Sequence, residues 1–355
     1  MLTAKKRTIA AFVESKFMEK NEYISSQAIS SMRSLDEQAQ RQTTQLAKSS
    51  DMDYFWGWAK VFHDEKEHYP VNWGMVFDFV ATHLEGNFDP EKEAKLIESK
   101  LKKERGRHKV ATVKRRLSTL SKEHKNRGHD GHANPCQHPD ALKLINDARR
   151  SPTHANTPSP AAVKLVVDKV ITSISDNLLG ICDKAMIYVS FGAGGRRRSE
   201  LVSLKFSDIV EITDTYYLIE IRGAKNQTYA DEVLTVKIEG KARSYLQEWL
   251  IASGVGDGYL FRQLTPRGQV VKEEGLSGTQ FYRIVKKRSI SSGIEYADKF
   301  TPHSLRSGFV TEQGKRGKNM YDGMAATGHK SREQYEKYYQ SGAAANNEAT
   351  SFDDT

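Results

Sequence analysis

The sequence has few of the features that mark secreted or membrane proteins. Its 355 residues contain two cysteines, Cys136 and Cys182, which excludes a disulfide framework. No apolar run approaches the roughly 18 residues of a membrane span, and the opening MLTAKKRTIAAFV lacks the long apolar core of a signal peptide. We therefore expect a soluble protein with no membrane partner that works in the reducing cytoplasm.

The sequence is also short of acidic residues. It has 54 Lys and Arg against 45 Asp and Glu, a formal net charge of +9. A basic chain favours an acidic partner, of which nucleic acid is the commonest and an anionic membrane surface the rival. Hydrophobic residues make up 38%, enough for cores, and the length favours two domains.

Changes in composition predict the organisation of the chain. Residues 1–50 are polar, rich in Ser and Gln and without strand alternation, so we expect an N-terminal extension that is helical or partly disordered. Residues 51–150 read as one helical domain. A linker rich in Pro, Ser, Thr and Asn occupies 151–160, and a second domain covers 161–340. The last residues, 341–355, are small and polar, which predicts a flexible tail.

The first domain shows two helical patterns. We expect inward-facing aromatic and aliphatic side chains in the segment that begins near Tyr54. A second segment has twelve Lys or Arg against two Glu between residues 100 and 127, beside one apolar stripe. Solvated helices usually mix their signs, so this excess predicts a surface that faces an anion, although a merely soluble outer face is the alternative. The inward set is Trp56, Phe62, Trp73, Phe77 and Val80; the stripe is Val110, Val113, Leu117 and Leu120.

The second domain is predicted to be mostly helical with a small antiparallel sheet, which makes the fold class mainly α (α+β). Ser159 and Pro160 are expected to start a helix, and DKAMIYVSF reads as a buried one. YYLIEIRGAKNQTYADEVLTVKI contains two β-rich runs around a polar loop, which predicts a hairpin. Helical patterns follow at KARSYLQEWLIA, TQFYRIVKKRSI, HSLRSGFVTEQ and SREQYEKYYQ.

One short stretch, TPHSLRSGF, combines a helix start with paired cations. Thr301 and Pro302 suit the first turn of a helix. His303 and Arg306 are three residues apart, so both face the same way. Two neighbouring cations are unfavourable unless an anion lies between them, which predicts an anion site here. Two further motifs point the same way: the arginines of FGAGGRRRSEL at a helix start, and the hairpin loop RGAKNQ with Lys225.

Five motifs, GRRRSEL, AKNQ, HSLR, TGH and EKYY, follow in an order that resembles the tyrosine site-specific recombinases, the phage integrase family. The resemblance covers about residues 160–340, and more loosely 54–150 as the helical core DNA-binding domain. It implies catalytic roles for Arg197, Lys225, His303, Arg306, His329 and Tyr338, and a supporting role for Glu200. The excess of basic residues between 100 and 127 then predicts DNA contacts by Lys109, Lys114, Arg115 and Arg116.

Two of these assignments leave neighbours open. Arg196 and Arg198 flank Arg197, which stands two residues before the Ser-Glu-Leu run. Tyr338 is selected because it lies nine residues after His329, while Tyr339 is adjacent and Tyr335 lies one turn earlier.

The resemblance implies a complete reaction without a metal or another cofactor. The arginines would grip a DNA phosphodiester and stabilise its growing charge, while Tyr338 attacks and forms a 3′-phosphotyrosine. Lys225 would protonate the leaving 5′-hydroxyl, and His303 would take the tyrosine proton or bind the phosphate. The expected partners are double-stranded DNA and three further copies, in a homotetramer on two duplexes. The expected role is the integrase of a mobile element, in the cytoplasm and associated with the nucleoid.

Other interpretations compete with this one. The same chemistry serves type IB topoisomerases and telomere resolvases, and a non-catalytic DNA-binding relative is a third possibility. His129, His132, Cys136 and His138 resemble zinc ligands, but their spacing fits no standard finger, so a polar loop is preferred. The tryptophans at 56, 58 and 73 could stack on bases, but at helical spacing they are more often core residues.

Overall fold

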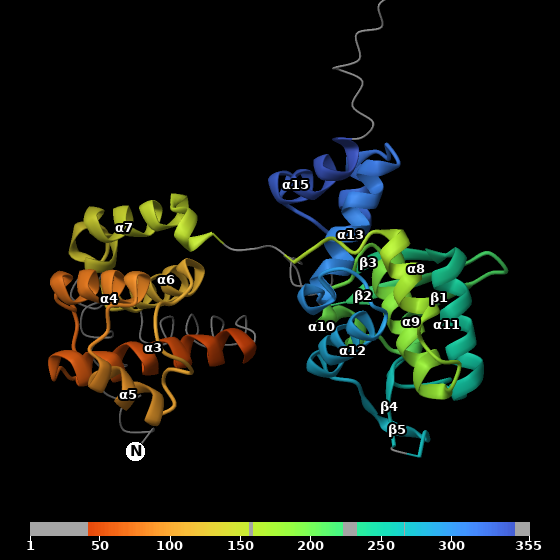
Figure 1. Ribbon diagram of the computed structural model, residues 1–355, viewed down its shortest axis with the longest axis horizontal. Coiled ribbons are helices and arrows are strands. Elements are labelled where there is room, and N and C mark those ends of the chain that lie inside the picture. The colour runs from red at the N-terminus through yellow and green to blue at the C-terminus, as the bar shows by residue number, and fades with distance from the viewer. Residues whose placement is uncertain (1–41, 156–158, 223–232, 266, 345–355) are drawn as a thin grey trace, which may run out of the picture. The chain divides into compact units, whose positions relative to one another are not determined.

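The computed structural model describes residues 42–155, 159–222, 233–265 and 267–344, which divide into two compact units (Figure 1). The division falls between residues 157 and 158, within the linker composition of 151–160. Each unit has its own hydrophobic core. Among the helices of the described ranges, none combines the length and the apolar character that a membrane span requires.

In its described residues, unit 1 is built from helices and short 3-10 turns. Helix α3 packs against α5 and α6, and α7 packs against α4 and α6 (Figure 1). The core is aromatic on the α3 side, where Trp58 is fully buried among Phe55, Phe79 and the neighbouring rings. The helices of unit 1 are α3 Gln42–His63, α4 Trp73–Glu85, α5 Pro90–Glu98, α6 Val110–Asn126 and α7 Pro139–Arg150, with 3-10 turns at Gly131–Ala133, Pro135–Gln137 and Pro152–His154.

The predicted apolar stripe of α6 is confirmed, because Val110, Val113, Leu117 and Leu120 are all buried. The prediction that Trp73 faces inward is wrong. It lies at the start of α4 with 51% of its surface exposed, and its ring stacks on that of His138 at 4.5 Å between centroids. Helical spacing alone does not show where a helix leaves the core, and Trp73 is the first residue of its helix.

The expected boundary at residues 50 and 51 does not separate two parts of unit 1. Helix α3 begins at Gln42 and continues through the boundary to His63. An ion pair of 2.6 Å between Lys48 and Glu123 ties this first part of α3 to α6. The polar residues 42–50 therefore form the start of a helix, with residues 44–47, 49 and 50 exposed, while residues 1–41 lie outside the described part of the chain.

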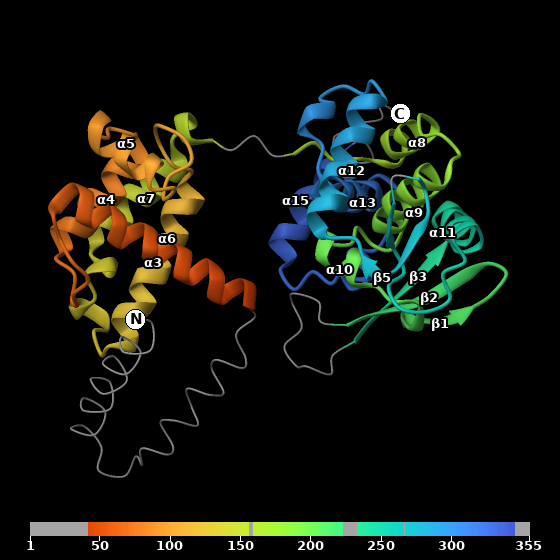
Figure 2. The ribbon, with the colours of Figure 1, turned by 90° about the horizontal axis from the view of Figure 1, so that it is seen from below.

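Unit 2 has a small antiparallel sheet beside a set of helices. The apolar helix α9 packs along α11, and both contact β3 (Figure 2). The strands run in the order β1-β2-β3, with Tyr217 opposite Ile238 and Ile219 opposite Val236 on the buried face. The elements are α8 Lys164–Thr172, α9 Leu178–Gly192, α10 Arg198–Ser203, β1 Ile209–Ile212, β2 Tyr216–Arg222, β3 Val233–Glu239, α11 Gly240–Ser253, β4 Arg262–Leu264, β5 Val270–Gly275, α12 Gly278–Ser291, α13 Pro302–Lys315, α14 Met320–Thr327 and α15 Arg332–Ala343, with 3-10 turns at Phe206–Asp208 and Ala297–Lys299.

The mainly helical fold with a small antiparallel sheet is confirmed, as is the β2–β3 hairpin. Strand β1 and the separate β4–β5 hairpin were not predicted. Three of the four β1 residues are exposed, and β4 has only three residues, so neither has an alternation long enough to stand out in the sequence.

Helix α8 begins at Lys164, so the prediction that it starts at Ser159 and Pro160 is wrong. The preceding residues contact α13 instead. The Ala162 N–H donates to the Ser304 carbonyl at 2.9 Å, and a Cβ on Gly308 would overlap the Ala162 carbonyl. This contact between distant segments holds the chain before α8 outside the helix.

Helices α13 and α15 cross at two glycines. A Cβ on Gly314 would overlap the Tyr339 carbonyl, and a Cβ on Gly342 would overlap the Thr311 carbonyl. The two backbones can therefore approach closely only because neither position carries a side chain. This packing also explains why α15 continues to Ala343, past residue 340 where the flexible tail was predicted to follow.

We predict that Gly314→Ala destabilises unit 2 by about 1–3 kcal/mol, because the overlap is with backbone atoms that cannot easily move. The gain in helix propensity, at most about 1 kcal/mol, should not offset this. Chemical denaturation of the full chain would measure the difference.

Gly256→Ala is the matched control for this substitution. A Cβ on Gly256 meets no atom within 4 Å and its φ is not positive, so stability should be unchanged or slightly higher. Equal stability of Gly314→Ala and the wild type would show that the crossing is not tight.

Candidate active site

A pocket of about 300 Å³ in unit 2 brings together the first and third of the motifs. Three consecutive arginines form one wall, two from the turn before α10 and one at the first position of that helix, and the start of α13 forms the opposite wall. Tyr282 of α12, which the sequence did not indicate, also lines it. The lining residues are Arg196, Arg197, Arg198, Tyr282, Thr301, Pro302, His303 and Arg306.

The first wall depends on two glycines with left-handed backbone between α9 and α10. Gly194 has φ of 85° and Gly195 has φ of 64°, values that other residues rarely adopt. A Cβ on Gly195 would overlap the Cα of Arg306, so the turn can lie against α13 only without a side chain there. The glycines of GAGG therefore form the turn and also allow it to pack closely against α13.

Arg197 is the N-cap residue of α10 and is held by Glu200. Its Nη1 lies 2.6 Å from Oε1 of Glu200, and its backbone N–H donates to Oε2 at 3.2 Å. The Arg197 side chain keeps 24% of its surface exposed, whereas Glu200 is buried. The carboxylate therefore orients a guanidinium that remains open to the pocket.

The second wall begins as predicted, with Thr301 at the N-cap of α13 and Pro302 in its first turn. The Ser304 hydroxyl, rather than the Thr301 side chain, completes the cap by accepting from the Thr301 N–H. Arg306 is 4% exposed, and its Nη1 donates to the Gly195 carbonyl at 3.0 Å. This bond fixes one wall to the other.

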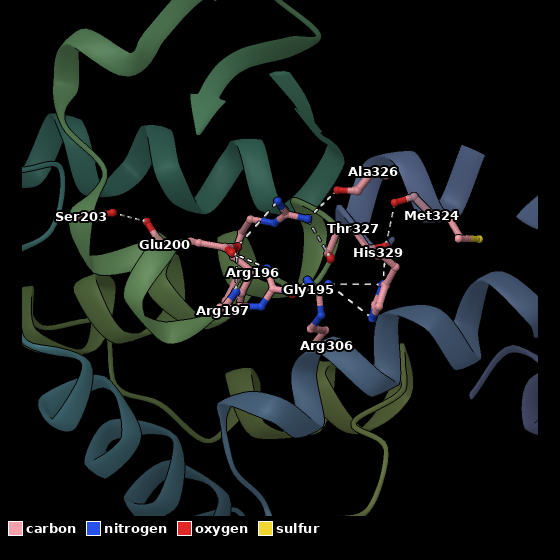
Figure 3. Close-up of polar contacts among 12 residues, drawn as sticks. Gly195, Arg196, Arg197, Glu200, Ser203, Arg306, Met324, Ala326, Thr327 and His329 are labelled. Carbon is pink, nitrogen blue, oxygen red and sulfur yellow. Dashed lines mark hydrogen bonds and ion pairs between the residues drawn. The ribbon is translucent and has the colours of Figure 1, made fainter. Parts of the chain in front are cut away.

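His329 completes the group from the turn after α14. Gly328 ends that helix in the left-handed conformation, and the His329 N–H donates to the Met324 carbonyl. Its Nδ1 is 2.6 Å from the Thr327 hydroxyl, and Nη2 of Arg306 lies 3.2 Å from the same nitrogen (Figure 3). A contact with a guanidinium requires the neutral imidazole.

The charges of the site are of one sign apart from Glu200. Burial and then the neighbouring Arg197 and Arg196 lower the pKa of Arg306 to about 9. Burial and then the arginines lower the pKa of His329 to about 3, and the same causes lower the pKa of His303. Each cation is thus disfavoured by the next, and an anion placed among them would relieve that repulsion.

The three tyrosines of α15 have different surroundings. The Tyr338 hydroxyl lies 3.4 Å from Nε2 of His303. Tyr339 donates its hydroxyl to the Lys318 carbonyl at 2.6 Å, and Tyr335 is fully buried with its ring 5.4 Å from that of His329. The geometry therefore brings Tyr338, and neither neighbour, to the hydroxyl contact with His303.

Lys225 lies outside the described residues, which stop at Arg222 at the end of β2 and resume at Val233. In unit 1, Lys109, Lys114 and Arg115 are exposed, and Arg115 also pairs with Asp51.

Arg116 departs from the expected surface position. Its guanidinium lies over the Tyr54 ring, 3.3 Å from the centroid, and its side chain is 12% exposed. Asp51 also faces it, with Nε to Oδ1 at 3.6 Å. Its charge is therefore used inside unit 1, which leaves Lys109, Lys114 and Arg115 as the exposed cations of the predicted DNA-contacting set.

The possible zinc ligands of unit 1 do not converge. Sγ of Cys136 is buried, 3.9 Å from Nδ1 of His124. Within the described part of the chain, no three His, Cys, Asp or Glu side chains are placed as they would be around a metal ion.

The chain matches the model of the phage integrase family over residues 164–344. It is 28% identical over 239 residues to an integrase/recombinase xerD homolog of Selenomonas ruminantium, which covers 66% of this chain and 69% of the relative. It is 32% identical over 158 residues to the tyrosine recombinase XerC of Herpetosiphon aurantiacus, 43% of this chain and 45% of the relative.

Solved structures share the fold. The XerH site-specific recombinase bound to a palindromic difH substrate superposes with a TM-score of 0.58 and 17% identity, covering 97% of this chain and 94% of XerH. The Tn1549 transposon integrase in complex with transposon right end DNA gives a TM-score of 0.56 and 14% identity, covering 97% and 99%.

The low pKa of His329 predicts a loss of stability in acid. A histidine whose pKa is lower folded than unfolded stays neutral in the native state, so stability falls as the pH drops below about 6.5 towards 3. We expect His329→Gln to reduce the loss between pH 6.5 and 4.5 by about 1–2 kcal/mol, measured by chemical denaturation at both values. Identical losses in variant and wild type would contradict the neutral, arginine-contacting state.

Proposed function

The chain belongs to the phage integrase family and is a tyrosine recombinase; on that premise we propose that Tyr338 attacks a DNA phosphodiester held by Arg197 and Arg306. The observation that carries this proposal is the contact between the Tyr338 hydroxyl and Nε2 of His303 beside a pocket lined by both arginines. The other two tyrosines of α15 have hydroxyl or ring contacts elsewhere.

The arginines supply the charge that the reaction needs. Phosphorus gains negative charge as it becomes five-coordinate, and preorganised guanidinium groups stabilise that charge most strongly where water is excluded. Arg306 is held by the Gly195 carbonyl and Arg197 by Glu200, so neither has to reorganise when the phosphate binds. His329 contributes a hydrogen bond to a phosphate oxygen.

Cleavage replaces one phosphorus–oxygen bond with another and moves two protons. The Tyr338 oxygen forms a bond to phosphorus while the bond from phosphorus to the 5′-oxygen breaks, giving a 3′-phosphotyrosine and a free 5′-hydroxyl. His303 accepts the tyrosine proton; its lowered pKa keeps it neutral and ready to do so. Lys225 of the β2–β3 loop supplies the proton to the leaving oxygen. Attack by a 5′-hydroxyl from a second duplex reverses the steps and exchanges the strands.

Unit 1 is proposed to bind the duplex through the exposed cations around α6. Lys109 is its N-cap residue, and Lys114 and Arg115 lie on its exposed side. Phosphate contacts of this kind position a protein on DNA without reading its sequence.

We propose a homotetramer on two duplexes, because the exchange of four strands requires four nucleophiles. Residues 345–355, the greater part of the predicted flexible tail, lie outside the described residues. A mobile element is the proposed source of the gene. Strand exchange between two duplexes separates this function from that of a topoisomerase, and covalent capture separates it from non-catalytic binding.

The nucleophile is tested by two single substitutions. Tyr338→Phe should bind DNA like the wild type but form no covalent adduct with a nicked suicide duplex, because only the attacking oxygen is removed. Tyr339→Phe is the matched control and should still form the adduct, with some loss of stability from the missing bond to Lys318. Adduct formation by Tyr338→Phe and not by Tyr339→Phe would move the assignment by one residue.

The basic face of unit 1 is tested by the salt dependence of binding. Combined Lys109→Gln, Lys114→Gln and Arg115→Gln should flatten the slope of log affinity against log salt by about one unit for each phosphate that the variant no longer neutralises. Arg116→Gln should instead lower the stability of unit 1 and leave the slope unchanged, since its charge faces Tyr54 and Asp51. An unchanged slope in the triple variant would mean that this face is only solvated.

A further inference from the structure

Arg196 is a buried arginine directly behind the candidate active site. Its side chain has no exposed surface, although both neighbours in the Arg-Arg-Arg run reach the solvent. We propose that Arg196 is a positioning residue that holds the turn bearing His329 against the turn bearing Arg197. The proposal rests on the proposed function, because it concerns the same reaction.

The contacts of Arg196 join two segments that are 130 residues apart in the sequence. Its Nη2 donates to the Ala326 carbonyl in the last turn of α14 and to the Gly194 carbonyl at 3.2 Å (Figure 3). Its own backbone is fixed to the end of α9, because its N–H donates to the Ser190 carbonyl at 2.7 Å. The side chain therefore extends from a rigid base to the helix end that carries His329.

The backbone is shaped for this approach. A Cβ on Gly194 would overlap the Ala326 carbonyl and would lie 2.8 Å from Nη2 of Arg196. The positive φ at Gly194 and the missing side chain together let the two turns come within reach of one guanidinium.

Packing alone does not account for an arginine at this position. Nε and Nη1 make no hydrogen bond within the described residues, and the nearest carboxylate oxygen, Oε2 of Glu200, is 3.9 Å from Nη1. A buried charge with so few partners is costly, and an apolar side chain of similar volume would fill the space without that cost. The guanidinium has to supply something that an apolar side chain cannot, and the bond to Ala326 is what it supplies.

The bond to Ala326 acts on catalysis through His329 and Arg306. The His329 N–H is bonded to Met324 of the same helix end, and its ring contacts Nη2 of Arg306. If α14 drifts away from the first wall, His329 and its contact with Arg306 move with it. Arg196 borders the pocket, but its side chain has no exposed surface, so its loss should slow cleavage while leaving DNA affinity nearly unchanged.

The test uses the full chain and a nicked suicide duplex at saturating protein. Arg196→Met removes the donors and the charge at similar volume, and Arg196→Lys keeps the charge with a single donor nitrogen. Arg262→Met is the matched control, because Arg262 is also buried and bonded to a backbone carbonyl, that of Tyr259, but does not line the pocket. The single-turnover rate constant describes the bound complex. Partial unfolding of a variant therefore lowers the amplitude of adduct formation but not this rate constant.

We expect Arg196→Met to cleave about ten- to a hundredfold more slowly than the wild type, the usual effect of a misplaced catalytic group. Arg196→Lys should fall between the two, because its ammonium can still donate to a carbonyl but its shorter side chain reaches less far towards Gly194 and Ala326 than Nη2 of the arginine does. Arg262→Met should cleave at the wild-type rate. If Arg196→Met does not fold, Arg196→Lys decides the question, and a wild-type rate in either variant overturns the proposal.

The pH profile separates positioning from a general loss of structure. The charge of Arg196 is one of the causes that lower the pKa of His329, so its removal raises that pKa. The pKa of His329, followed by NMR titration of its imidazole, should move to higher pH in Arg196→Met and stay in place in Arg196→Lys and Arg262→Met. A wild type without adduct would refute the proposed function itself, whereas a wild-type rate in Arg196→Met would refute only the role of Arg196.

Discussion

Three guanidinium groups share a small volume in unit 2, and their mutual repulsion constrains everything around them. Arg196, Arg197 and Arg306 come from two segments that are far apart in the sequence. Each is held by oxygen atoms of the protein: the Ala326 carbonyl, the Glu200 carboxylate and the Gly195 carbonyl. Repulsion that would otherwise open the two walls is thus resisted by the bonds that define their spacing, and a phosphate between them would add to that resistance.

Adjacent arginines have different roles in this arrangement. Arg197 and Arg306 can present charge to a ligand, while Arg196 lies behind them without exposed surface. The glycines at 194 and 195 allow the segments of the site to pack closely, because a backbone atom from another segment occupies the space that a side chain would fill at each position. Charge and close backbone packing therefore meet in one turn.

Features that depend on neighbouring residues could be predicted from the sequence, and features that depend on distant contacts could not. The start of α13, the β2–β3 hairpin and the apolar stripe of α6 each follow from residues within a few positions of one another, and all three are confirmed. Nothing in the Arg-Arg-Arg run shows that Arg196 is the buried one, since Ala326 on another helix decides that. The sequence predicts Arg116 to be a surface cation, but in the structure its guanidinium lies over the Tyr54 ring. Helix α8 starts later than predicted because Ala162 is hydrogen-bonded to α13.

The glycine crossing of α13 and α15 has a mechanical meaning. One helix carries His303 and Arg306, the other carries Tyr338, and at Gly314 and Gly342 their backbones touch. Sliding either helix by one residue would bring a side chain to the crossing point. The two helices therefore have one packing register and should move as a rigid unit. Removing Tyr338 from the active site would therefore require α13 and α15 to move together, or α15 to unwind from its end.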